Sequence, residues 1–413
     1  MVILLKRALR HKLGVGLTAA MMTAALIAVA LGAGVANGAQ QAAKRTYNTI
    51  TRASLLPRTP PADGANVKGA QLFVLSHLGA PKFVAPGPGF NIKKVTKPVW
   101  LFEAVANDPP VPQVATGFID AAKAARVPYH VCLANGTPEG NALCLQQAAA
   151  AHAGSAVMWS VPLTEVVQPL KAAEAAGVKV VSGNDSLRIG APINPAVVAE
   201  VSHNYYEAGQ ENGAYAVASK GGTVDAICIN IPDFYTGTAV CQGFTTEVHA
   251  FCPACKVKTV DVPGATALTQ APAVVNTAIL SDSKLNYVAT SYDYIDPAID
   301  AELKLLNKKP GQVSVAGENG SIAPLQAIKS GNYDASNAGQ DPYWWGWAFF
   351  DAAARVQVGA IGKKSIVTTP DELFTKQTLA QYHGTLSYAD ADAVYGLGNG
   401  AIYKNGYESL WHG

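Results

Sequence analysis

Amide and carboxylate side chains follow short apolar runs at several places in this sequence. The clearest case lies within residues 171–186, KAAEAAGVKVVSGNDS, where an Ala-rich run stops at Gly177. Glycine suits the left-handed turn just past a helix end, and residues 178–181 are typical of a short buried strand. Asn184 and Asp185 come soon after that strand. Open α/β sheets place ligand contacts there, although either residue could simply cap the turn that follows.

The residue types that carry covalent chemistry form no catalytic pattern in this chain. The sequence has no Gly-x-Ser-x-Gly elbow, no His-Glu-x-x-His zinc pattern and no Gly-x-x-x-x-Gly-Lys phosphate loop. The eight histidines include His203, beside Asn204, for which we favour a packing role. We therefore expect no enzyme activity, no catalytic residue, no metal site and no cofactor.

Four of the six cysteines predict two disulfides. Cys132 and Cys144 lie 12 residues apart on an expected strand and the next helix, and Cys228 and Cys241 repeat that arrangement 13 residues apart. An even number of cysteines in an exported chain usually indicates disulfides. We predict one disulfide between Cys132 and Cys144 and another between Cys228 and Cys241.

The other two cysteines, Cys252 and Cys255, have the Cys-x-x-Cys spacing of thioredoxin-like redox sites. They follow an expected helix and precede the expected strand 257–260, whereas a redox site needs its cysteine at a helix N-terminus. We therefore predict a structural bridge within a loop.

The first 38 residues have the order of a secretory signal peptide. Four basic residues and no acid precede an apolar run over residues 13–35, and small residues follow at Ala36 and Gly38. We expect cleavage after Gly38 and export to the periplasm or the cell surface. The apolar run is long for a signal, so an uncleaved membrane anchor is the alternative.

Length and composition predict a compact α/β protein with two ordinary domains. The chain has 413 residues, of which 49% are apolar and 15% charged, and it contains 38 glycines. Its formal charge of +2 includes the four basic residues of the expected signal, which leaves about −2 for the mature chain. Binding to nucleic acid is therefore not expected.

Apolar runs alternate with helical patterns from Lys97 onward. This order predicts parallel strands with helices on both faces, arranged as two similar doubly wound lobes. The expected strands are 99–102, 129–133, 156–159 and 178–181 in the first run, and 224–229, 257–260, 287–290 and 313–316 in the second. The helices expected between and after them include 205–219 and 344–358. The proline-containing residues 39–95 are expected to form a linker or collar.

Polar motifs follow the expected strands in a definite order. They are Asn-Asp-Pro at 107–109, Asn-Asp at 184–185, Tyr-Asp at 292–293, Gly-Glu-Asn-Gly at 317–320 and Asn-Ala-Gly-Gln-Asp-Pro at 337–342. In this order and spacing the chain resembles the type I periplasmic solute-binding proteins, in the ribose-binding-like cluster that serves ABC importers. The resemblance covers residues 97 to about 378.

Each motif has a counterpart in that family. The first resembles an Asn-Pro element at the cleft, the second an Asp-Arg pair and the third an Asn-Asp tip. Asn319 takes the place of a ligand-binding carboxylate, and Gln340 matches a late hinge glutamine. Residues 370–377 resemble the closing strand.

The resemblance implies two lobes joined by three crossings, with a ligand held between them and hinge closure on binding. The first lobe would be 97–203 plus 342–370, the second 204–341 plus 371–413, and the crossings would lie near Asn204, Asp341 and Thr369. The implied partners are a small-molecule ligand and an ABC permease with its ATPase, and a monomer is expected. A membrane-associated ligand-sensing receptor of the same fold is the alternative function.

The strand-end residues form a candidate ligand site that is rich in acids and amides. The candidates are Glu103, Asn107, Asp108, Trp159, Asn184, Asp185, Asp233, Tyr235, Tyr292, Asp293, Asn319, Gln340 and Asp341. Arg188 is the only arginine nearby, and burying an anion without a cationic partner is costly. We therefore predict a small neutral polyhydroxylated ligand or a cationic one.

Two further segments are rich in aromatic residues. Trp344, Trp345 and Trp347 are expected mainly to pack along a helix face, although Trp344 is near enough to Gln340 in sequence to line the cleft. The tail, residues 381–413, is expected to wrap around the second lobe, and a lid over the cleft is the alternative.

Overall fold

The structure is a computed structural model that describes residues 64–413 except 105–108, 161–162, 185–194, 362–364 and 399. The chain divides into two units, 1–48 and 49–413, and the described residues all belong to the second. The expected signal peptide therefore lies outside the described residues. Among the helices that are described, none is both long and apolar enough to cross a membrane.

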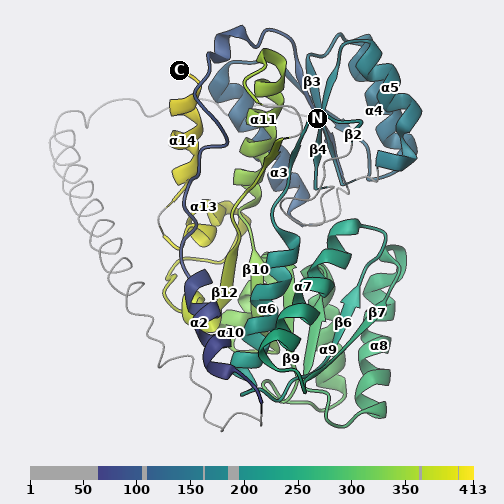
Figure 1. Cartoon of the computed structure of the whole chain (residues 1–413), viewed down its shortest axis with the longest axis vertical. Helices are drawn as coiled ribbons and strands as arrows, with labels where there is room; N and C mark the ends of the chain where they lie inside the picture. The colour runs from purple at the N-terminus through teal and green to yellow at the C-terminus, as the bar shows by residue number, and fades with distance from the viewer. Residues whose placement is uncertain (1–63, 105–108, 161–162, 185–194, 362–364, 399) are drawn as a thin grey trace, which may run out of the picture. The chain divides into compact units, whose positions relative to one another are not determined.

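The first lobe contains a six-stranded sheet in which every neighbouring pair is parallel. Its order is β11-β5-β4-β3-β1-β2 (Figure 1). The strands are β1 (Val99–Glu103), β2 (Tyr129–Leu133), β3 (Ser155–Trp159), β4 (Lys179–Gly183), β5 (Ala199–Val201) and β11 (Ser365–Val367). Strands β1 and β3 are buried along their whole length, as expected for central strands of a sheet with two covered faces.

Four helices accompany this sheet: α3 (Val111–Ala125), α4 (Pro138–Ala150), α5 (Val167–Ala175) and α11 (Pro342–Val358). Helices α3 and α11 approach each other very closely. A Cβ atom added to Gly346 would lie 2.2 Å from the Val114 carbonyl oxygen, and one added to Gly117 would lie 2.3 Å from the Tyr343 carbonyl oxygen. Glycine at both positions is therefore required for this packing, which joins the late helix α11 to the first lobe.

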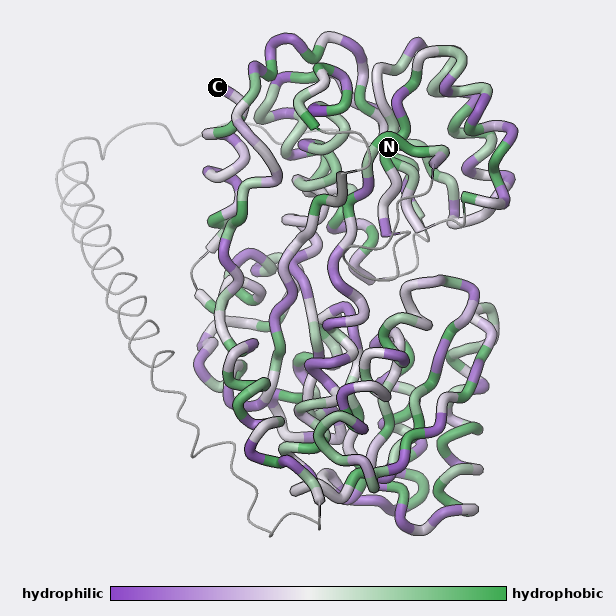
Figure 2. Tube along the Cα trace, viewed as in Figure 1, coloured by the Kyte–Doolittle hydropathy of each residue, from purple (hydrophilic) through white to green (hydrophobic). Residues whose placement is uncertain are grey.

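The second lobe contains another six-stranded sheet, in the order β12-β10-β9-β8-β6-β7. All neighbours are parallel except β12, which runs antiparallel to β10 at the edge. The strands are β6 (Asp225–Asn230), β7 (Lys256–Asp261), β8 (Tyr287–Thr290), β9 (Ser314–Asn319), β10 (Asp334–Gly339) and β12 (Glu372–Thr375). The helices are α6 (Tyr205–Ser219), α7 (Tyr235–Phe251), α8 (Ala267–Ser281), α9 (Asp296–Leu305) and α10 (Ile322–Ser330). Outer helices such as α8 alternate hydrophobic and hydrophilic residues (Figure 2), the pattern of a helix with one face on the sheet.

The two-lobed α/β fold predicted from the sequence is confirmed. Strands β2 and β8 and helix α6 have the predicted bounds, and most other elements differ by one to three residues at an end. Strands β5, β10 and β11 were not predicted. Three residues are too few to show a period in β5 and β11, and β10 has none of the β-branched or aromatic residues typical of strands.

The three expected disulfides are present. They join Cys132 to Cys144, Cys228 to Cys241 and Cys252 to Cys255. The first two each fasten a strand to the following helix, and the third closes the turn between α7 and β7. None of the described cysteines is free.

The predicted collar is more than a linker. Helix α2 (Val67–His77) packs on α6, and its Val67, Ala70 and Val74 belong to the core of the second lobe. The chain then passes to the first lobe, where residues 90–95 supply buried Phe90, Ile92 and Val95. This stretch therefore connects the two lobes. Its partner helix α6 lies far away in sequence, so the sequence alone did not predict this packing.

The tail also connects the lobes, and its assignment to the second lobe alone is wrong. Helix α12 (Lys376–Leu379) packs on α10 and β12 of the second lobe, whereas α14 (Ile402–Leu410) packs on α11 and α3 of the first. Helix α13 (Ala391–Tyr395) contacts both lobes, because it packs on α11 and its Tyr395 ring meets Phe374 of β12. Trp411 stacks on Trp347 with ring centroids 5.5 Å apart. Besides the three expected crossings, two more segments of the chain thus run from one lobe to the other, residues 78–90 and residues 380–402 (Figure 1).

Candidate functional site

A small cavity lies where the two lobes face each other. It encloses about 60 Å³. Its walls are Ala104, Pro110, Val111, Trp159, Ser160 and Trp345 from the first lobe, and Tyr205, Phe234, Thr236, Tyr292, Tyr294 and Asn319 from the second. None of these twelve side chains carries a charge at neutral pH. We call these residues the interlobe pocket.

The carboxyl ends of parallel strands supply most of the pocket. Ala104 follows β1, Trp159 ends β3 and Ser160 comes next, Tyr292 follows β8, and Asn319 ends β9. This edge is where open α/β sheets bind their ligands, because the chain leaves the packed core there. Because the two lobes face each other, strand ends of different sheets come together here, such as Ala104 and Asn319, which are 215 positions apart in sequence.

Three non-glycine residues at these strand ends have a left-handed backbone. They are Ser160 with φ 53°, Asn184 with φ 58° and Asn319 with φ 106°. Such conformations cost energy and persist only where the surrounding structure holds them, commonly at binding sites. Asn184 is also buried, and neither atom of its side-chain amide has a hydrogen-bond partner.

Aromatic rings form the two faces of the interlobe pocket. Trp159 and Trp345 meet edge to face with centroids 5.0 Å apart, and Phe234 meets Tyr292 in the same manner at 5.9 Å. The indole Nε1 atoms of both tryptophans are buried and lack an acceptor. The pocket thus offers flat apolar faces, and two of the residues that line it carry an indole N–H group without an acceptor.

Tyr292 is held in place by its neighbours in the second lobe. Its hydroxyl forms a short hydrogen bond with the Thr236 hydroxyl, and both groups are buried. A Cβ atom at Gly237 would lie 3.0 Å from the Tyr292 ring, so glycine there lets helix α7 approach. These contacts fix the ring that faces the first lobe.

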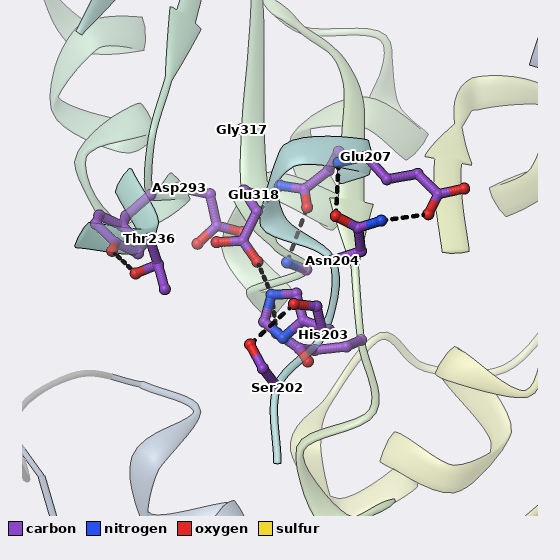
Figure 3. A network of polar contacts seen from close by, with 12 residues as sticks. Ser202, His203, Asn204, Glu207, Thr236, Asp293, Gly317 and Glu318 are labelled. Carbon is purple, nitrogen blue, oxygen red and sulfur yellow. Dashed lines mark hydrogen bonds and ion pairs between the residues drawn. The ribbon is translucent and has the colours of Figure 1, made fainter. Parts of the chain in front are cut away.

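A buried polar network lies at the first crossing between the lobes. His203 Nε2 lies 2.9 Å from Glu318 Oε1 and 3.0 Å from the Gln340 amide nitrogen, and all three side chains are buried. Figure 3 shows the His203 ring turned toward Glu318, with Asn204 and Glu207 on the adjoining turn. Burial holds the pKa of His203 well below its usual value, so the ring is neutral. His203 therefore packs at the hinge, as expected.

Asp293 lies beneath the pocket and supports the turn after β9. Its Oδ2 accepts hydrogen bonds from the Ser321 backbone N–H at 2.6 Å and from Asn337 Nδ2 at 2.9 Å. Burial raises its pKa to about 6, although these hydrogen bonds favour the ionised form. The Tyr395 hydroxyl donates to the Gly320 carbonyl at 2.6 Å, so the tail supports the same turn.

The structure places only part of the predicted site in the pocket. Trp159, Tyr292 and Asn319 line it. Glu103, Asn184, Asp293 and Gln340 are buried nearby without lining it. Asp233 is exposed and accepts from the Gly264 N–H at 2.8 Å, and Tyr235 is 46% exposed. Asn107, Asp108 and Asp185 lie outside the described residues.

Asp341 and Trp344 face the tail instead of the interlobe pocket. Asp341 caps helix α11, accepting from the N–H groups of Tyr343 at 2.9 Å and Trp344 at 3.3 Å. Trp344 stacks on Tyr403, with centroids 5.0 Å apart. Trp344 therefore has the packing role expected for it, and the alternative that it lines the cleft is wrong. Successive helical residues point about 100° apart, so the next residue, Trp345, faces the pocket instead.

Several pocket residues were not predicted from the sequence. Tyr205 lies at the start of α6, Thr236 in the first turn of α7 and Trp345 in the first turn of α11. All three belong to helix N-termini that directly follow a strand or a crossing. This shared position could have identified them as pocket residues, because a helix that follows such a strand begins at the ligand edge of the sheet.

Residues 104–362 match the family described as the periplasmic binding protein domain. No curated protein matches the chain. Among solved structures, it is similar to a 5-methylthioribose transporter solute-binding protein from Thermotoga lettingae, with 16% identity and a TM-score of 0.63 over 78% of this chain and 99% of that one. It is also similar to an ABC transporter solute-binding protein from Mycobacterium smegmatis with bound glycerol. That similarity has 20% identity and a TM-score of 0.61, and it covers 70% of this chain and 98% of that one.

A third similar structure is an ABC transporter solute-binding protein from Agrobacterium vitis with bound allitol. It is 17% identical, with a TM-score of 0.60, and the similarity covers 70% of this chain and 98% of that one. These structures share the fold of the two lobes. Because the family match extends over more than half of the 413 residues, the chain belongs to the periplasmic binding protein family.

Proposed function

We propose that this protein is an extracytoplasmic solute-binding protein that holds a small neutral polyhydroxylated molecule between its lobes. The molecule would then be delivered to an ABC importer, a permease with its ATPase. The observation that carries this proposal is the interlobe pocket at the ligand edge of both sheets, whose described lining residues are aromatic or otherwise uncharged.

The chemistry of the pocket matches a polyol or a sugar. The C–H groups of such molecules lie well on aromatic faces, which Trp159, Trp345 and Tyr292 provide. Their hydroxyl oxygens accept hydrogen bonds, which suits the two indole N–H groups that lack acceptors. Asn319 adds an amide that both donates and accepts.

A cationic ligand is less well supported. The described residues that line the pocket include no carboxylate, and Asp293 and Asp341 are engaged with backbone N–H groups. A cation has no lone pair for the unpaired indole donors. We therefore favour the neutral member of the two ligand classes predicted from sequence.

The similar solved structures agree with this choice. Those described above carry allitol, glycerol or 5-methylthioribose, and each is named as a solute-binding protein of a transporter. By analogy we favour transport over the sensing receptor. The cavity of about 60 Å³ is far smaller than the ~300 Å³ of ordinary ligand pockets, so we expect the lobes to separate when ligand enters.

A thermal-shift screen followed by calorimetric titration tests the proposal. Sugars, polyols, amines and dicarboxylates would be added one at a time, because a ligand that binds only the folded state raises its Tm. We expect Tm to rise with one or more sugars or polyols and not with dicarboxylates. Selective binding of a dicarboxylate, a phosphate ester or an amine would contradict the proposed ligand class.

A further inference from the structure

Three potential metal ligands come together on the second lobe, away from the interlobe pocket. His77 ends helix α2, while Glu207 and Glu211 lie on α6. One ligand atom from each lies within 4.8 Å of the others. The two glutamates are four residues apart and so share one face of α6, the face that α2 covers.

The imidazole of His77 is oriented with Nε2 toward the two glutamates. Its Nδ1 lies 2.8 Å from the Phe73 carbonyl oxygen. A carbonyl can only accept, so Nδ1 carries the hydrogen and the neutral ring has its lone pair on Nε2. Nε2 lies 3.4 Å from Glu207 Oε1. A backbone carbonyl on the far nitrogen is the usual support for a metal-binding histidine.

Glu207 is oriented in a similar way. Its Oε2 accepts a hydrogen bond from Asn204 Nδ2 at 2.8 Å, as Figure 3 shows, which leaves Oε1 on the His77 side. Ligand atoms in a tetrahedral site with bonds of about 2.05 Å lie about 3.4 Å apart. The spacing between His77 Nε2 and Glu207 Oε1 already has that value.

Glu211 is the observation that points to a missing cation. It is 4% exposed, and its Oε2 has no hydrogen-bond partner. Glu372, 2% exposed at the start of β12, interacts electrostatically with Glu211, and neither of its carboxylate oxygens has a partner. In the part of the chain that the structure describes, no lysine or arginine forms an ion pair with either residue.

Burial is costly for two carboxylates that lack a basic partner. The neighbouring Asp371 and Glu207 place further negative charge near Glu211. A bound cation would offset this cost.

We propose that His77, Glu207 and Glu211 bind a divalent transition-metal ion such as Zn²⁺, with Glu372 adding negative charge behind Glu211. One imidazole with carboxylates suits Zn²⁺, whereas Ca²⁺ and Mg²⁺ prefer sites built from oxygen ligands alone. The ligands come from separate segments, so no local His-Glu pattern marks the site in the sequence.

The metal would fasten the N-terminal helix α2 to the second lobe. Helix α2 leads directly into the passage that reaches the first lobe, and Glu372 follows the crossing near Thr369. The ion would thus hold one end of a connection between the lobes. This role does not depend on which solute occupies the interlobe pocket.

The test measures zinc bound to the purified full chain. The protein is treated with EDTA, desalted, equilibrated with ZnCl₂ and desalted again, and its metal content is determined by mass spectrometry. We expect about one zinc ion per chain that excess Ca²⁺ or Mg²⁺ does not displace. We also expect Tm to be higher with zinc than with EDTA.

Single substitutions assign the zinc to the proposed ligands. His77→Gln, Glu207→Gln and Glu211→Gln should each lower the zinc retained to less than about a tenth of the wild-type content. His249→Gln, at an exposed histidine on α7, is the matched control and should retain wild-type zinc. Circular dichroism in EDTA checks that each variant is folded.

Two outcomes would overturn the site. One is that the wild-type protein retains no zinc and that the Glu211→Gln variant has a higher Tm than wild type in EDTA. This result is expected if Glu211 and Glu372 merely share a proton. The other is zinc retention that His77→Gln and Glu207→Gln leave unchanged. Both of those side chains are partly exposed, so these variants decide the question even if Glu211→Gln fails to fold.

Discussion

Trp159 and Trp345 meet edge to face, with ring centroids 5.0 Å apart and planes at 66°. One ends strand β3 and the other lies in the first turn of α11, so 186 positions separate them in sequence. Together they form the aromatic wall of the first lobe. Tyr292 and Phe234 form the facing wall of the second.

Trp345→Ala should weaken solute binding about ten- to hundredfold, which corresponds to about 1.4–2.8 kcal/mol. The substitution removes both an aromatic face and an unpaired indole donor from the pocket. Isothermal titration with the solute found in the screen measures the change.

The adjacent Trp344 provides the matched control for that experiment. It is equally buried but stacks on Tyr403 of the tail, so Trp344→Ala should lower Tm while the affinity stays close to wild type. Equal losses of affinity in the two variants would show that the effect at Trp345 is not local to the pocket.

Asn319 allows the side chain and the backbone to be tested separately. Its φ of 106° suits glycine and strains alanine. Asn319→Gly should keep the wild-type Tm within a few degrees and lower solute affinity about tenfold, because one amide contact is lost. Asn319→Ala should lower both. Unchanged affinity in the glycine variant would mean that only the turn, and not the amide, matters for binding.

His203 should make stability depend on pH below about 6.5. Burial keeps its folded-state pKa well below the usual 6.5, so the unfolded chain binds a proton that the folded chain does not. The stability that His203 contributes is therefore fully present above about pH 6.5 and is lost as pH falls, at up to about 1.4 kcal/mol per pH unit.

Buried acids such as Asp293 titrate in the opposite sense, so the His203 contribution is best measured as a difference. The Tm of wild type minus that of His203→Gln should be constant from pH 7 to 8 and should narrow toward pH 5. The exposed His383 serves as control, and His383→Gln should show no such trend. A difference that is constant across the whole range would contradict a neutral buried ring.

Trp411 should anchor the tail to the first lobe. It is 2% exposed, stacks on Trp347 and donates from Nε1 to Asp351 Oδ1 at 2.8 Å. Trp411→Ala should lower the free energy of unfolding by about 3–5 kcal/mol, as is usual for a large buried aromatic residue. Denaturant unfolding measures this loss.

Solute affinity separates this structural role from that of a lid. No residue of α14 lines the interlobe pocket, so Trp411→Ala should bind solute with nearly wild-type affinity wherever it is folded. A large loss of affinity at unchanged Tm would instead support the lid that the sequence left open.

The sequence by itself determined the alternation of strands and helices and the disulfide pairs. Residues 287–290 and 205–219 show their type locally, because burial of one face or of both imposes a period on nearby residues. Cys132 and Cys144 lie on a strand and on the helix that follows it, so their pairing follows from local order. The strand-end rule also placed Trp159, Tyr292 and Asn319 at the site.

Only the tertiary structure decided which faces meet. In the folded chain Trp345 rather than Trp344 lines the pocket, α14 packs on α11, and His77 lies close to Glu211. These contacts join segments far apart in the chain, and their partners depend on how whole helices pack. A local pattern shows that a residue will be buried, but the partner is set by the packing of distant segments.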